Sequence, residues 1–149
     1  MDDNIERKPE DLAYLAGYID ADGSIGLYHR KKDNYCRPSV SISASRRDIL
    51  EELREIAALG GNIHLSHSSP FSGRYVSVLK YQNLQACKVC KLVVPYLRLK
   101  KVQAQILVHI GDFRNKHRNK LCINRKAYFI PRYEEMKRLN AANKSLNIR

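Results

Sequence analysis

Apolar residues recur at helical spacing near the start of the chain. Leu12, Leu15 and Ile19 fall on one stripe of a helix, which predicts a helix that Pro9 opens. Gly23 follows as a residue whose backbone can leave a helix sharply. The pattern therefore predicts one amphipathic helix that ends close to residue 23.

Two strands are predicted after this helix, at residues 24–32 and 37–44, with turn-forming residues at 32–34. In the second strand, polar and apolar side chains alternate strictly. One face holds Arg37, Ser39, Ser41 and Ser43, and the other holds Val40, Ile42 and Ala44. This alternation is typical of an antiparallel strand with one buried face.

The same pattern then recurs along the chain. We expect a helix at 48–59, strands at 62–67 and 74–81, and helices at 83–96 and 100–113. A basic loop should span Arg114 to Lys126, and Pro131 should open a last helix. The order α-β-β-α-β-β-α predicts an α+β fold in a single domain over 1–149. Its core covers about 10–113, and the loop and extra helix cover 114–149.

Charge is the compositional feature that points to a partner. The net charge is +12, and residues 71–126 hold thirteen Lys and Arg against one acid, Asp112. Such one-sided charge suits nucleic acid, although a merely soluble basic protein is the alternative. A hydrophobic content of 44% argues against disorder. With no membrane-length apolar run, we expect a soluble intracellular protein of the cytoplasm or an organelle.

Three very small residues, Ala13, Gly17 and Ala21, form a second stripe on the first helix. Small side chains let two helix backbones approach closely. The stripe can serve a symmetric dimer, or it can pack against another helix of the same chain.

Residues 15–23 read Leu-Ala-Gly-Tyr-Ile-Asp-Ala-Asp-Gly. This segment resembles the signature of the LAGLIDADG homing endonucleases, with Tyr18 replacing a leucine. Ser24-Ile25 and residues 94–104 are also similar to the family, so the resemblance covers about 10–113. It implies an antiparallel sheet that forms a saddle over DNA. Because only one signature is present, it also implies a homodimer whose signature helices lie side by side.

The resemblance implies intron homing through metal-dependent double-strand cleavage of a long, roughly palindromic DNA site, with short 3′ overhangs. Asp22 and the Ala21 backbone carbonyl are the implied ligands of Mg²⁺, which Mn²⁺ or Ca²⁺ can replace. An exposed carboxylate suits such a hard cation, although a solvated helix-end acid is the alternative. Asp20 is not assigned to metal. The implied dimer interface comprises Ala13, Gly17, Asp20 and Ala21.

Lys100 matches the lysine of the family's catalytic pocket, where a cation stabilises negative charge on phosphate. A plain phosphate-binding lysine is the alternative, and Lys101 competes for the role. Arg46 or Arg47 matches a basic residue of that pocket. The family often orients water with a polar residue at the end of the second strand. Ser43 and Ala44 stand there, and alanine cannot do this.

Sequence readout is expected from alternate side chains of the strands, because antiparallel ribbons fit the major groove. The predicted DNA-binding residues are Tyr28, Arg30, Lys32, Arg37, Ser39, Ser41, Arg46, Arg47, Asn62, His64, Ser66, Tyr75 and Ser77. Arg30 and Arg37 are the strongest candidates because a guanidinium can donate two hydrogen bonds to guanine. The alternative is a set of merely solvated strand faces.

Two further functions stay open beside the endonuclease. Some members of the family are RNA maturases, for which RNA would be the partner, and others bind DNA as regulators without cutting it. The acids at Asp20 and Asp22 favour the nuclease. Cys87 and Cys90 form a lone CxxC in a helical pattern, where packing in the core is a simpler role than zinc binding.

Overall fold

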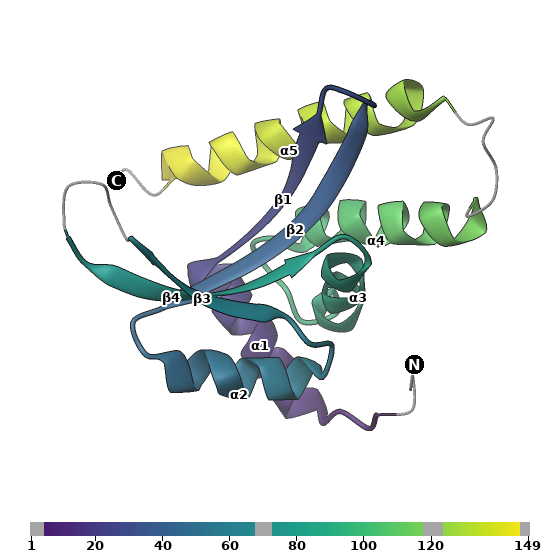
Figure 1. Ribbon diagram of the computed structural model, residues 1–149. Coiled ribbons are helices and arrows are strands. Elements are labelled where there is room, and N and C mark those ends of the chain that lie inside the picture. The colour runs from purple at the N-terminus through teal and green to yellow at the C-terminus, as the bar shows by residue number, and fades with distance from the viewer. Residues whose placement is uncertain (1–4, 68–72, 118–123, 147–149) are drawn as a thin grey trace.

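The computed structural model describes residues 5–67, 73–117 and 124–146, which form five helices and four strands (Figure 1). The elements are α1 Pro9–Asp22, β1 Gly23–Arg30, β2 Tyr35–Ala44, α2 Arg47–Ala57, β3 Asn62–His67, β4 Tyr75–Gln82, α3 Leu84–Val93, α4 Lys101–Lys116 and α5 Arg125–Leu146. This order confirms the predicted α-β-β-α-β-β-α arrangement with additional C-terminal helices.

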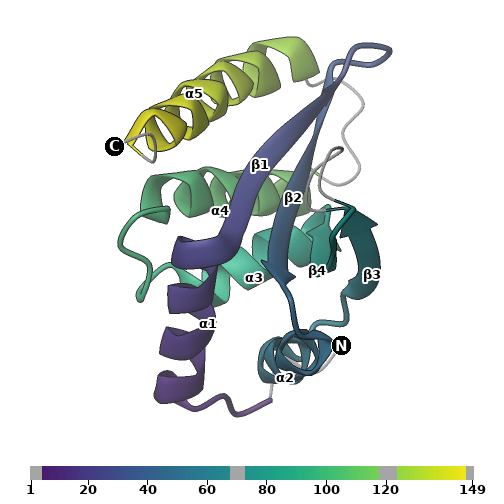
Figure 2. The same ribbon diagram turned by 90° about the vertical axis from the view of Figure 1, so that its left-hand side faces the viewer.

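The two predicted hairpins combine into one antiparallel sheet of strand order β1-β2-β4-β3. β2 and β4 are the central strands, and their pairing places Ile42 opposite Leu79. The helices α1, α3 and α4 lie on one side of this sheet (Figure 2). The opposite face carries mainly polar side chains, so the sheet has one buried and one open face.

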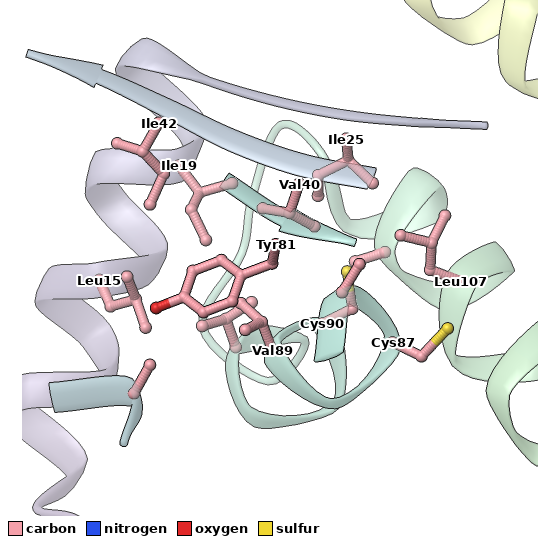
Figure 3. Packing of buried hydrophobic residues seen from close by; sticks show 14 of the residues in the cluster. Leu15, Ile19, Ile25, Val40, Ile42, Tyr81, Cys87, Val89, Cys90 and Leu107 are labelled. Carbon is pink, nitrogen blue, oxygen red and sulfur yellow. The ribbon is translucent and has the colours of Figure 1, made fainter. Parts of the chain in front are cut away.

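Alternation in β2 produces the buried face as predicted, with Val40, Ile42 and Ala44 buried. Leu15 and Ile19 of α1 belong to the same hydrophobic cluster as these strand residues (Figure 3). Burying one such aliphatic side chain contributes roughly 1.5–3 kcal/mol.

The CxxC cysteines are part of this core. Cys87 and Cys90 of α3 are buried free thiols, and burial raises the pKa of Cys87 to about 11. Within the described ranges, no group of three or more His, Cys, Asp or Glu side chains could hold a metal ion. The interpretation of this pair as core residues agrees with the structure.

The predictions for the C-terminal region were wrong in two respects. Arg114 lies inside α4 and Lys126 inside α5, so the basic loop is shorter than expected, and its residues 118–123 lie outside the described part of the chain. Pro131 does not open a helix but lies within α5.

Packing and capping explain the early start of α5. The Tyr128 ring stacks on Phe113 at a centroid distance of 3.5 Å, and Phe129 is buried against the core. The Asn124 side chain accepts a hydrogen bond of 3.1 Å from the Ala127 amide, as an N-cap residue does. With these contacts the helix begins at Arg125, well before the exposed Pro131.

The long helix α5 lies beside β1 in both views (Figures 1 and 2). The Asn140 side-chain amide donates a 3.1 Å hydrogen bond to the Ile25 carbonyl. α5 therefore covers part of the edge of β1, which would otherwise expose unpaired backbone groups. No helix among the described residues has both the length and the apolar character required to cross a bilayer.

Candidate nuclease site and DNA-binding face

Asp22 is the last residue of α1, and its side chain is exposed. The chain passes directly from this residue into β1 through Gly23. A Cβ atom on Gly23 would stand 2.7 Å from the Cα and carbonyl oxygen of Ile19. Only glycine fits this close approach, so the signature's last residue allows the abrupt exit that leaves Asp22 uncovered.

Lys100 immediately precedes α4, and its ammonium lies at the end of α1. Its Nζ donates hydrogen bonds of 2.8 Å to the Ile19 carbonyl and 2.9 Å to the Asp20 carbonyl. Desolvation lowers the pKa of Lys100, while the nearby carboxylates of Asp20 and Asp22 act to raise it. The structure thus brings Lys100 and Asp22, which are far apart in sequence, to the same helix end.

Asp20 links the same two elements in the reverse sense, from the end of α1 to the segment before α4. Its carboxylate accepts hydrogen bonds from the backbone amides of Arg98 at 2.8 Å, Leu99 at 3.2 Å and Lys100 at 3.0 Å. A carboxylate at the start of α4 and an ammonium at the end of α1 are both favourable for the helix dipoles. The Asp20 carboxylate, predicted to lie in a dimer interface, is thus engaged within the subunit.

The stripe of Ala13, Gly17 and Ala21 lies on the exposed side of α1. A Cβ atom built on Gly17 meets no atom within 4 Å among the described residues. The alternative that this stripe packs against another helix of the same chain is therefore wrong for the part of the chain that the structure describes. This face of α1 is therefore uncovered within the described residues.

The open face of the sheet collects most of the predicted DNA-binding residues. Those in its strands are Tyr28, Arg30, Arg37, Ser39, Ser41, Asn62, His64 and Ser66. A hollow of about 380 Å³ on this face is lined by Gly26, Leu27, Tyr28, Arg37, Ser39, Lys80 and Gln82. Lys32 lies in the turn beyond β1, so its predicted place in that strand is wrong.

The predicted face of β4 was also wrong. Ser77 is only 4% exposed and lies on the core side, in step with Leu79 and Tyr81. Tyr75 shares this side but is exposed, and its ring lies 4.2 Å from that of His67. Successive residues of a strand face opposite sides of the sheet. An error of one residue in the predicted register of β4 therefore assigned core-facing residues to the DNA-binding face.

The residues missed by the sequence analysis are Lys80 and Gln82 of β4. Lys80 lies opposite Ser41 in β2, and Gln82 lies opposite Ser39. Their alternation with the apolar Leu79 and Tyr81 was the signal that could have identified them. Both carry the polar groups that base recognition requires.

The four arginines predicted to bind DNA differ in whether their side chains already bind a carboxylate of the same chain. Arg30 donates to Asp33, Arg46 donates to Asp48, and Arg47 donates to Glu51. Arg37, by contrast, has no hydrogen bond or ion pair to any other residue in the described ranges. Among the described residues its whole guanidinium is therefore without a partner, whereas each of the other three binds a carboxylate.

The end of β2 offers a single polar side chain at the predicted water-positioning place. Ala44 is 8% exposed and points into the core, whereas Ser43 is half-buried on the other side. Of these two positions, only Ser43 can serve a role on the open face.

Residues 9–84 match a family model described as a LAGLIDADG-like domain. The chain belongs to this LAGLIDADG-like family. The match includes the signature at residues 15–23 and extends from α1 through β4. A search of curated proteins found no match.

Solved structures of LAGLIDADG homing endonucleases share the fold. I-CvuI bound to its DNA target in the presence of Ca is 21% identical, with a TM-score of 0.67 over 89% of this chain and 85% of that chain. I-CeuI, a group I intron-encoded homing endonuclease complexed with DNA, is 17% identical, with a TM-score of 0.64 over 90% of this chain and 69% of that chain. I-GzeII, solved with its DNA target, is 22% identical, with a TM-score of 0.61 over 82% of this chain and 42% of that chain.

Proposed function

We propose that the protein is a metal-dependent, sequence-specific DNA endonuclease that acts as a homodimer. It cuts both strands of a long, roughly palindromic site and leaves short 3′ overhangs, in the setting of intron homing. The observation that carries this proposal is the exposed Asp22 carboxylate at the end of α1, with the Lys100 ammonium at the same helix end.

The donor set at this helix end fits Mg²⁺. The Asp22 carboxylate and the Ala21 carbonyl are hard oxygen ligands of the kind that Mg²⁺ or Ca²⁺ takes. When bound, the cation activates water and stabilises the leaving oxygen of a phosphodiester. Complexes of I-CvuI with DNA were obtained in the presence of Mg or Ca, which is consistent with divalent cation use in this fold.

Lys100 has a defined role in the proposal. An ammonium has three N–H groups, and the Lys100 ammonium donates two hydrogen bonds, to the carbonyls of Ile19 and Asp20. A donor remains for a phosphate oxygen next to Asp22. The positive charge so placed stabilises the charge that develops on the transferring phosphate.

A second copy of the chain completes the proposed site. Two α1 helices packed through Ala13, Gly17 and Ala21 bring two Asp22 carboxylates together, one for each DNA strand. The chain covers 42% of the I-GzeII chain, a proportion expected when two copies correspond to one longer protein. The open sheet faces and the net charge of +12 favour DNA as the partner.

Cleavage of a randomised double-stranded DNA library by purified protein with Mg²⁺ tests the proposal. Sequencing of the cut ends should recover one roughly palindromic site with 3′ overhangs. Selective binding without cutting would instead identify a DNA-binding regulator. Promotion of intron RNA splicing without DNA cleavage would identify a maturase.

Lys100→Ala is expected to slow cleavage by roughly 10²–10³-fold while changing DNA affinity much less. The reason is that Lys100 acts on charge that appears only in the transition state. Single-turnover cleavage and equilibrium binding measure the two effects separately. Lys101→Ala, which removes the adjacent exposed lysine, is the matched control. Equal losses of binding and cleavage in the Lys100 variant would make it a simple phosphate contact.

Arg37→Ala is expected to cost about 1–3 kcal/mol of discrimination at one base position of each half-site. Its free guanidinium borders the hollow of the open face, where it can reach a base edge. Affinities for a set of singly substituted targets measure this. Lys126→Ala should instead weaken binding to all sequences alike and lower the salt slope by about one. A uniform loss for Arg37→Ala would contradict base readout.

A further inference from the structure

The turn between β1 and β2 carries an acid on a surface that otherwise favours DNA. Asp33 is the only Asp or Glu between Asp22 and Asp48, a stretch that also contains six Lys and Arg. A carboxylate near the phosphate backbone opposes binding by charge repulsion. We therefore expect a contact of Asp33 that offsets this unfavourable repulsion in DNA binding.

Asp33 binds one edge of the Arg30 guanidinium. Its Oδ1 accepts from Arg30 Nε at 2.9 Å, and its Oδ2 accepts from Arg30 Nη2. The Tyr35 amide donates to the same carboxylate at 3.3 Å, which ties the pair to the turn. The hydrogen bond from Arg30 lowers the pKa of Asp33 to about 2, so the carboxylate stays ionised wherever DNA binding is measured.

The pair leaves the other edge of the guanidinium available. The bound edge comprises Nε–H and one N–H of Nη2. The second N–H of Nη2 and an N–H of Nη1 point in parallel along the end of the side chain. Two parallel donors of this kind match the N7 and O6 acceptors of guanine in the major groove.

The location of Arg30 suits this use. Arg30 is two residues from Tyr28 in β1 and shares its face of the sheet, and the Arg30 side chain is 49% exposed. Its guanidinium carbon also lies 5.9 Å from the centre of the Tyr35 ring. Asp33 and Tyr35 thus restrict where the free edge of Arg30 can point.

We propose that Asp33 is a specificity-determining positioning residue, which holds the Arg30 guanidinium so that its free edge reads a guanine. This inference rests on the proposed DNA-binding function and deepens it. A long flexible side chain loses less entropy on binding when it is already oriented. Without Asp33, Arg30 is free to turn to a phosphate, a contact that carries no sequence information.

The experiment compares the wild type, Arg30→Ala, Asp33→Ala and the double variant on the target and on all single-base variants of it. Arg30→Ala should lose about fivefold to about a hundredfold of discrimination at one position of each half-site. Asp33→Ala should lose most of that discrimination at the same position, with equal or higher affinity for mismatched sites. The double variant should lose no more there than Arg30→Ala alone.

Asp33→Asn provides a second test that preserves the turn. Its amide oxygen can still accept from Tyr35, but it cannot accept both N–H groups of Arg30. Asp112→Asn is the charge-matched control, because Asp112 is exposed on α4, on the helical side of the sheet. It should alter no positional preference.

Two results would overturn the inference. One is an Asp33→Asn protein that binds all sites more tightly yet keeps its preference at the Arg30 position. The other is an Arg30→Ala protein that loses discrimination at no position. Failure of the proposed function looks different, since the wild type itself would then show no sequence-selective DNA binding.

Discussion

Asp22→Asn is expected to give a folded protein that binds its DNA target and cuts neither strand. Asparagine keeps the size of the side chain but removes the negative charge that holds a divalent cation. Metal activation is worth several kcal/mol of the barrier, so the cleavage rate should fall roughly a thousandfold or more. Single-turnover cleavage with Mg²⁺ measures the rate, and a gel shift in Ca²⁺ measures binding.

Two controls separate loss of chemistry from loss of structure. Asp22 stands at the C-terminal end of α1, where a negative charge opposes the helix dipole. Thermal unfolding of Asp22→Asn should therefore show unchanged stability or a gain of about 0.3–1 kcal/mol. Asp112→Asn changes the net charge equally and should cut at the wild-type rate. Cleavage by Asp22→Asn at a rate near wild type would remove Asp22 from the metal site.

Gly17→Leu is expected to convert a dimer into a monomer without unfolding the subunit. Within the described residues a Cβ atom at Gly17 meets nothing within 4 Å, so the subunit has room for a side chain there. Between two closely packed helices, a leucine would separate the backbones. Sedimentation velocity should show the monomer, and cleavage should fall because one subunit carries a single Asp22.

Substitutions to alanine at two glycines provide the matched comparison. Gly17→Ala replaces glycine on an exposed helix face, so the subunit itself should gain up to about 1 kcal/mol of helix stability. Gly111→Ala should lose roughly 1–3 kcal/mol, because its Cβ would stand 2.8 Å from the Cβ of Cys87. Association should be unaffected by the Gly111 change. A Gly17→Leu protein that sediments as a dimer would contradict the proposed interface.

Local patterns in the sequence were sufficient for several parts of the fold. The spacing of Leu15 and Ile19 predicted the buried side of α1, and both residues are fully buried. The alternation around Val40 and Ile42 predicted which side of β2 packs on the core. These predictions succeeded because the periodicity of a helix or strand is a property of neighbouring residues. The family also followed from a contiguous segment, residues 15–23.

The orientation of β4 was decided by the tertiary structure, because the alternation at residues 79–82 does not extend to the start of the strand. Apolar residues occur on both of its faces, with Val76 and Val78 on one and Leu79 on the other. Pairing with β2 decides the matter by placing Leu79 opposite Ile42, which turns Lys80 and Gln82 toward the open face. The start of α5 was decided in the same way, by the packing of Tyr128 on Phe113 rather than by Pro131.

The sequence by itself determined the family, the element order and the identity of Asp22 as the residue to test. Only the tertiary structure brought Lys100 close to Asp22. The Lys100 ammonium donates to carbonyls in the last turn of α1, and the Asp20 carboxylate accepts from the Lys100 amide at the start of α4. These partners are about 80 residues apart. No periodicity connects them, because their distance depends on how the sheet places α1 and α4 on the same face.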